Sequence, residues 1–201
     1  GSVTATFAAL TANVSAGAQS VSVASSASFA AGDFAVLRDN TYFNSVDTAA
    51  RNQEIVRVIS KTGTTLTFSS YLSGSYTTAQ SAQVALLLPV VGARVAGLRF
   101  RIPSGNTGGG IFASYAIDCL FDDVHVTGNK GTPGFRLDTS YRCHFSRWSA
   151  RDTFDPTLSD GTSYGLIFNE GTAFCTARSG FAEKVREDTF TNYTHHCDYV
   201  G

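Results

Sequence analysis

The segment between Cys143 and Cys175 gathers the side chains best suited to chemistry on a sugar. Carboxylates and a guanidinium bind sugar hydroxyls, aromatic rings stack on pyranose faces, and glycoside hydrolysis needs two carboxylates about 5–9 Å apart. A surface loop on a rigid scaffold is also a common place for function. We therefore expect a glycan-contacting surface here, formed in part by Arg151, Asp152, Asp155, Asp160 and Tyr164.

A second interpretation of this segment is a solvated loop. Asp155-Pro156 and Asp160-Gly161 are dipeptides that form turns without any ligand. No pair of carboxylates falls in one column of neighbouring repeats, so no catalytic residue is assigned, and an enzyme is not favoured.

Four cysteines, Cys119, Cys143, Cys175 and Cys197, could hold a metal, form disulfides or fill a core. They are 24, 32 and 22 residues apart, and none belongs to a C-x-x-C pair, which disfavours zinc. Adjacent strands lie about 4.8 Å apart, which suits disulfide geometry only marginally. We expect a buried structural ladder of reduced thiols, because free cysteine behaves as a small hydrophobe.

Neither a metal nor a cofactor is expected elsewhere. His195 and His196 lie near Asp198, but adjacent side chains of a strand point to opposite faces, so the two imidazoles do not easily reach one ion.

The repeat around the cysteines has the period of a strand. Apolar residues recur two, five and seven positions after the cysteine, as in Phe121, Val124 and Val126. Between the last two columns lies a mostly polar one, Arg99, His125, Ser149 and Phe181. A further short strand precedes each cysteine, and no helical period appears. This pattern predicts an all-β parallel β-helix, with Trp148 directed inward.

The sequence pattern differs between the two halves of the chain. Residues 3–90 carry short strands separated by turns such as Ala31-Gly32-Asp33, which predicts a small N-terminal β domain. Residues 91–201 carry the coils, and we expect them to be truncated at the C-terminus. Gly1-Ser2 is interpreted as a tag remnant.

Composition argues against two classes of partner. The net charge is −1 and no basic run occurs, which disfavours a duplex nucleic-acid binder. No apolar run approaches the 18 residues of a membrane span, and the longest, Val84 to Leu88, suits a buried strand. No membrane insertion is expected.

Several segments together resemble a known family. Gly17 to Val23, Ala31 to Asp33 and Glu54 to Val58 resemble the small β domain that precedes the β-helix in many bacteriophage tail spike and tail fibre proteins. The coil with Ser163 to Leu166 and Phe174 to Thr176 is similar to coils of the same pectate-lyase-like, right-handed β-helix group, although Arg186-Glu187 stands where Arg-His is frequent.

The resemblance implies a homotrimer in the virion tail, assembled in the host cytoplasm beside other phage tail proteins. It implies recognition of bacterial surface polysaccharide as host receptor. Two alternatives stay open: a polysaccharide depolymerase, acting as hydrolase or lyase, and a purely structural trimeric stalk.

Overall fold

The computed structural model describes residues 1–42, 51–103, 110–128, 131–154, 163–185, 187–192, 194 and 196–200, with the backbone alone for 187–192. The chain divides into two compact units, Gly1–Pro89 and Val90–Gly201. Both are built of strands, and no helix in the described part is long and apolar enough to cross a membrane.

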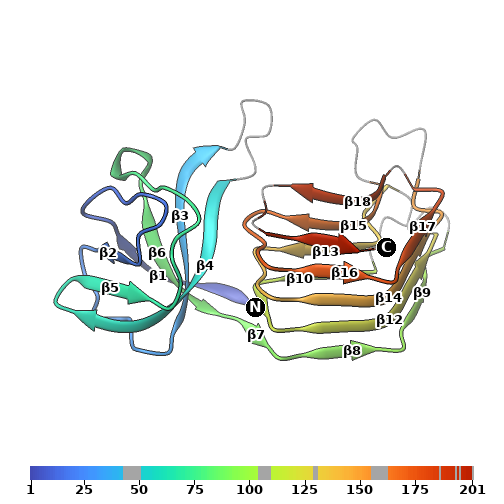
Figure 1. Cartoon of the computed structure of the whole chain (residues 1–201), viewed down its shortest axis with the longest axis horizontal. Helices are drawn as coiled ribbons and strands as arrows, with labels where there is room; N and C mark the ends of the chain where they lie inside the picture. Colours follow the sequence, from blue (N-terminus) through green and yellow to red (C-terminus); the bar gives the residue numbers. More distant parts are fainter. Residues whose placement is uncertain are drawn as a thin grey trace. The chain divides into compact units, whose positions relative to one another are not determined.

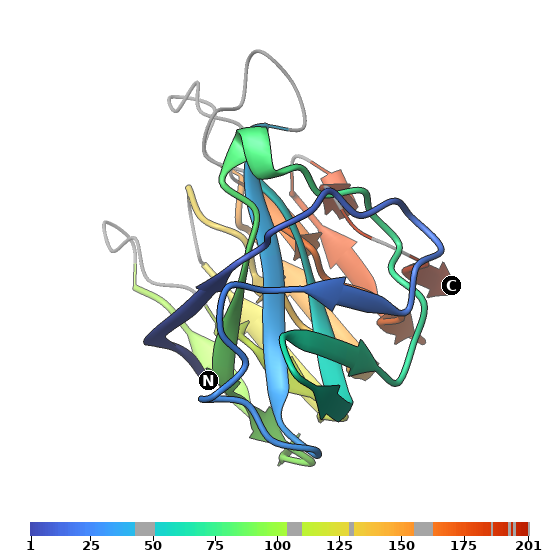
Figure 2. The same cartoon turned by 90° about the vertical axis from the view of Figure 1, so that its left-hand side faces the viewer.

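The first unit is one antiparallel sheet in the order β1-β6-β3-β4-β5-β2 (Figure 2). Its core includes the fully buried rings of Phe29, Phe68 and Tyr76. Its elements are β1 (Ser2–Ala9), β2 (Ser20–Ser22), β3 (Phe34–Tyr42), β4 (Arg51–Thr62), β5 (Thr65–Phe68), the 3-10 helix η1 (Thr78–Gln80) and β6 (Gln83–Leu88).

A buried carboxylate fixes one edge of this core. Glu54 accepts hydrogen bonds from the Tyr76 hydroxyl at 2.9 Å and from the backbone amides of Ser73 at 2.9 Å and Gly74 at 3.1 Å. Burial, reinforced by the nearby Glu54 carboxylate, raises the pKa of Tyr76 well above its usual value. Both carboxylate oxygens of Glu54 and the hydroxyl of Tyr76 thus have hydrogen-bond partners, so we interpret Glu54 as structural.

The second unit is a parallel β-helix, as the repeat predicts (Figure 1). One sheet has the order β10-β13-β15-β18, and another has β19-β16-β14-β12-β8, with β9 beside β12 and β17 beside β14. A short third face joins β11 to β7. The strands are β7 (Val90–Val91), β8 (Arg94–Ala96), β9 (Arg99–Arg101), β10 (Ile111–Ser114), β11 (Ala116–Ile117), β12 (Leu120–Thr127), β13 (Phe135–Asp138), β14 (His144–Arg151), β15 (Tyr164–Asn169), β16 (Thr176–Arg178), β17 (Phe181–Glu183), β18 (Glu187–Asn192) and β19 (Asp198–Val200).

The apolar columns of the sequence become ladders inside the coils. Phe121 pairs with Phe145 and Phe145 with Ala177, and the two phenylalanine rings stack with centroids 4.5 Å apart. Trp148 pairs with Val124 and is 4% exposed, so it points inward as predicted. Alternation along a strand then directs the residues between these columns outward.

Each coil bends at two fixed places beside its cysteine position. Wherever the structure describes it, the residue four positions after this one has positive φ, at Gly97 (71°), Asp123 (55°), Arg147 (52°) and Ser179 (50°), with Ala93 at the cysteine position of the first coil. The residue just before it repeats this conformation, as at Asp118 and Arg142. Left-handed backbone is unfavourable for residues with a Cβ, so the stacked coils around these bends must hold them in place.

The cysteines fill the interior beside these bends. Cys119, Cys143 and Cys175 are buried, Cys197 is half-buried, and all four thiols are free. The Cys143 backbone amide donates a hydrogen bond to the Cys175 sulfur at 3.2 Å. Thiols therefore serve here as small core side chains, which also donate hydrogen bonds to backbone carbonyls, as Cys119 does to Ile117 and Cys143 to Tyr141.

Candidate functional site

Two columns of outward side chains run across the coils on one face of the second unit. The first column is set by the pairings of Arg99 with His125, His125 with Ser149, and Ser149 with Phe181. The second lies two residues further along each strand and contains Arg101, Thr127, Arg151 and Glu183. Parallel in-register pairing stacks each column along the solenoid axis.

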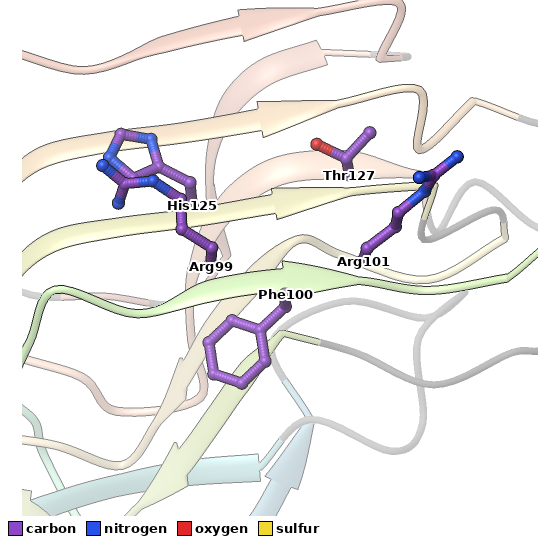
Figure 3. A pocket seen from close by; sticks show the side chains of 5 residues that line it. All are labelled: Arg99, Phe100, Arg101, His125 and Thr127. Carbon is purple, nitrogen blue, oxygen red and sulfur yellow. The ribbon is translucent and has the colours of Figure 1, made fainter.

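The two columns enclose a groove. One hollow of about 340 Å³ is lined by Arg99, Phe100, Arg101, His125 and Thr127. A second, of about 300 Å³, shares three of these residues and adds Ser149, Arg151 and Phe181. Figure 3 shows Arg99, Arg101, His125 and Thr127 on one side of the strands and the Phe100 ring on the other. We call this surface the Arg–His groove, and its residues are Arg99, Arg101, His125, Thr127, Ser149, Arg151 and Phe181.

Hydrogen bonds fix the imidazole at the centre of the groove. His125 Nδ1 lies 2.6 Å from Ser149 Oγ, and Nε2 lies 3.0 Å from Asp123 Oδ1. The hydrogen bond from His125, followed by that from Arg99, lowers the pKa of Asp123. An ionised carboxylate only accepts, so Nε2 carries the proton; in the neutral imidazole Nδ1 then accepts from the Ser149 hydroxyl.

This chain of Ser149, His125 and Asp123 has the residue types of a nucleophilic triad without the surroundings of one. Ser149 is only 5% exposed, which limits access of a substrate to its oxygen. Backbone amides of β12 and β14 that could stabilise an oxyanion belong to a parallel ladder. We interpret the chain of hydrogen bonds as a means of holding the imidazole in one orientation.

The acidic side chains at the groove do not form a glycosidase pair. Asp123 contacts Arg99, whereas Glu183 lies two coils away beside Arg151. Two rungs alone separate such positions by roughly 10 Å, and the offset along the strands adds to this. Glycoside hydrolysis uses carboxyl groups about 5–9.5 Å apart. These two carboxylates are therefore suited to orienting arginines.

The arginines of the groove differ in how they are paired. Arg99 contacts the Asp123 carboxylate at 3.2 Å, and Arg151 lies 3.7 Å from Glu183 with its guanidinium 4.6 Å from the Phe181 ring centroid. The Arg101 side chain is exposed, and no ion pair or hydrogen bond joins it to the side chain of another described residue. Among the described residues, Arg101 is thus the guanidinium of the groove that no carboxylate engages.

The sequence-predicted site residues fall into three groups. Arg151 lines the groove, and Asp152 follows it at a bend, 3.4 Å from the ammonium of Lys184. Tyr164 begins β15 in the other sheet, half-buried. Asp155 and Asp160 lie outside the described residues. The proposed surface formed by all five together stays a prediction.

The histidines near the C-terminus show no sign of a metal site in the part that is described. His196 is exposed and stacks on Phe174 with centroids 5.0 Å apart, whereas His195 lies outside the described residues. No group of three or more His, Cys, Asp or Glu residues that could hold a metal occurs among the described residues.

Most of the groove was not predicted as a site. The sequence does place Arg99, His125, Ser149 and Phe181 in one outward column. A mostly polar column is equally typical of a binding site and of an ordinary solvated surface. The missed signal is the second column, in which Arg101 and Arg151 stand on either side of Thr127. It becomes visible only when the coils are stacked in register.

No family model and no curated protein matches this chain. Several solved structures are similar to it. Tailspike gp61 of Pseudomonas phage phi297 superimposes with a TM-score of 0.81 at 13% identity, over 99% of this chain and 34% of that one. The chain has a phage tailspike fold. Tailspike gp49 of Pseudomonas phage LKA1 gives a TM-score of 0.72 at 20% identity, over 96% of this chain and 38% of that one. The chain therefore spans about a third of the length of either tailspike.

Proposed function

We propose that this chain is a segment of a phage tailspike that recognises bacterial surface polysaccharide during host attachment, and that the Arg–His groove is the contact surface. The groove itself carries the proposal: an outward, cation-rich hollow that crosses several coils of a tailspike-fold solenoid. Its two hollows share Arg99, His125 and Thr127, so a ligand can extend from one to the other.

The side chains of the groove suit a saccharide. Arginine offers five N–H donors in a rigid fork, the Thr127 hydroxyl both donates and accepts, and Phe181 is 46% exposed beside them. Rungs of a parallel sheet repeat about every 4.8 Å, which is comparable with the length of one sugar unit. A polysaccharide aligned with the solenoid axis would therefore meet similar surroundings at each coil.

Binding is favoured over cleavage for this surface. Among the described residues, the carboxylates at the groove, Asp123 and Glu183, are two coils apart, and Ser149 is buried. A depolymerase and a stalk are the competing outcomes of the test below. We further propose that the parent protein is a homotrimer in the virion tail, joined there to other tail proteins; light scattering of the full-length parent that gives a monomer mass would contradict this.

The test blocks the groove without touching the core. Thr127→Tyr places a bulky ring on the outer side of β12, where Thr127 is half-buried. Ala96→Tyr adds a similar ring to exposed Ala96 of β8, outside both hollows, and serves as the matched control.

The whole chain is measured against an immobilised panel of purified capsular polysaccharides and O-antigens. We expect at least one glycan to bind, with binding lost in Thr127→Tyr and retained in Ala96→Tyr. Equal binding by both variants would remove the groove from the proposal. Release of reducing sugar or of an unsaturated product during the assay would instead favour the depolymerase.

A further inference from the structure

We propose that the Arg–His groove selects a glycan that carries an anionic substituent, a carboxylate or a phosphate, and that Arg101, Thr127 and Arg151 form the seat for it. This inference rests on the proposed function, because it names the class of saccharide for the same groove.

The groove is net positive, whereas the chain as a whole is close to neutral. The chain has 15 basic and 16 acidic residues, a net charge of −1. Counted over the described residues, the groove holds three arginines, Arg99, Arg101 and Arg151, against the two carboxylates that contact them, Asp123 and Glu183, so 3 − 2 leaves an excess of one positive charge with His125 neutral. A local excess of one sign in a hollow attracts ligands of the other sign.

The excess charge lies at a definite place. Arg99 is engaged twice by Asp123, at its carboxylate and at its backbone carbonyl, both at 3.2 Å. Arg151 keeps only a loose contact of 3.7 Å with Glu183. Arg101 has no ion-pair partner among the described residues. Within the described part of the chain, the positive charge least engaged by carboxylates therefore belongs to Arg101, with Arg151 next.

The register brings these two arginines around one hydroxyl. Arg101 pairs with Thr127 and Thr127 with Arg151, so Thr127 lies between the two guanidinium-bearing residues in a single outward column. Neighbouring rungs are about 4.8 Å apart, and arginine side chains are long enough to converge over the central residue. An anion above Thr127 would accept hydrogen bonds from both guanidinium groups and from the hydroxyl.

A carboxylate or phosphate fits such a seat better than a neutral hydroxyl does. Hydrogen bonds between an arginine and an oxyanion are charge-assisted and often bidentate, and they are roughly twice as strong as neutral ones. A neutral sugar leaves the free guanidinium of Arg101 without a countercharge. The groove should therefore discriminate between two glycans that differ only in the charge of one substituent.

The experiment compares charged oligosaccharides with their neutral counterparts by titration calorimetry on the whole chain. Oligogalacturonate is paired with its carboxyl-reduced form, and a phosphorylated mannan oligosaccharide with its dephosphorylated form. Arg101→Gln removes the free charge, and Arg178→Gln is the matched control because Arg178 is an exposed strand arginine outside both hollows. The two pairs distinguish a carboxylate ligand from a phosphate ligand.

We expect at least one charged probe to bind about tenfold or more tightly than its neutral counterpart. Arg101→Gln should remove most of this difference, Arg178→Gln should not, and added salt should weaken the charged probe alone. No binding of either charged probe, equal affinity for the neutral forms, or equal effects of the two substitutions would each overturn the inference. Neutral probes that bind and are lost in Thr127→Tyr would leave the proposed function standing and refute only the anionic seat.

Discussion

Gly180→Ala adds a single methyl group and should destabilise the β-helix. Gly180 lies in the bend that follows Ser179, and the indole ring of Trp148 from the preceding coil occupies the space where a Cβ would be. An added methyl would overlap the Cε2, Nε1 and Cδ1 atoms of the ring. Trp148 is 4% exposed and packs edge-on against Phe135, so the indole cannot move into solvent.

Overpacking of a filled core costs about 1–3 kcal/mol. Gly180 does not have positive φ, so alanine is compatible with its backbone and would otherwise stabilise the chain by about 0.4–1 kcal/mol. The sign of the effect thus depends on the indole. With Trp148→Val, which installs the residue that the preceding coil has at Val124, Gly180→Ala should become neutral or stabilising. The coupling energy between the two positions is then about 1.5–4 kcal/mol.

Thermal unfolding of the four proteins, followed by circular dichroism, measures this cycle. A destabilisation of about 1–3 kcal/mol corresponds to a drop of roughly 2–12 °C in Tm for the single Gly180→Ala variant. Trp148, the only tryptophan, also reports unfolding of the second unit by fluorescence where it is present. An unchanged or raised Tm for Gly180→Ala alone, or an equal loss in the Trp148→Val background, would refute the packing explanation.

Two further predictions concern the reactivity of the thiols and the loss of stability at low pH. In native protein Cys197 should react first with a thiol reagent, because it is half-buried while Cys143 and Cys175 are fully buried; simultaneous reaction of all four would indicate unfolding instead. Hydrogen bonds from Arg147, and secondarily from Arg94, lower the pKa of Asp122 in the folded chain. The stability from this carboxylate is thus present above its unfolded pKa of 3.8 and is lost as the pH falls through the lower folded value. Asp122→Asn should reduce the loss of Tm between about pH 5 and pH 2. The same loss of Tm in this variant as in the unchanged chain would contradict the role of this ion pair.

The interior of the coils could be predicted from the sequence because it is constrained by volume. Each inward position faces the same position of the next coil, so a ladder such as Phe121, Phe145 and Ala177 leaves a repeated apolar mark in the sequence. Trp148 could be placed by the same reasoning. The large indole ring fits in this column because the next coil has a glycine, Gly180, at the paired position.

The bends could not be predicted in the same way. Glycine is the usual signal for positive φ, and among the four coils in which the position four after the cysteine column is described only the first carries it, at Gly97. Later coils place Asp123, Arg147 and Ser179 in that conformation, residue types that appear in many other settings. The stacked backbone of neighbouring coils determines the bend, and that information is absent from any single coil.

The groove could not be predicted because outward positions are free of the volume constraint that marks the core. An outward column tolerates any soluble residue, so Arg99, His125 and Ser149 look like ordinary surface until their neighbours are known. The segment between Cys143 and Cys175 is longer than its neighbours, at 32 residues against 24 and 22, yet length records only that the surface tolerates an insertion. Of the predicted site residues that the structure describes, Arg151 lines the groove, where the register sets it and Arg101 on either side of Thr127. In a solenoid, therefore, the residues to compare for a binding surface are those one coil apart, because side chains distant in sequence share one column of the surface.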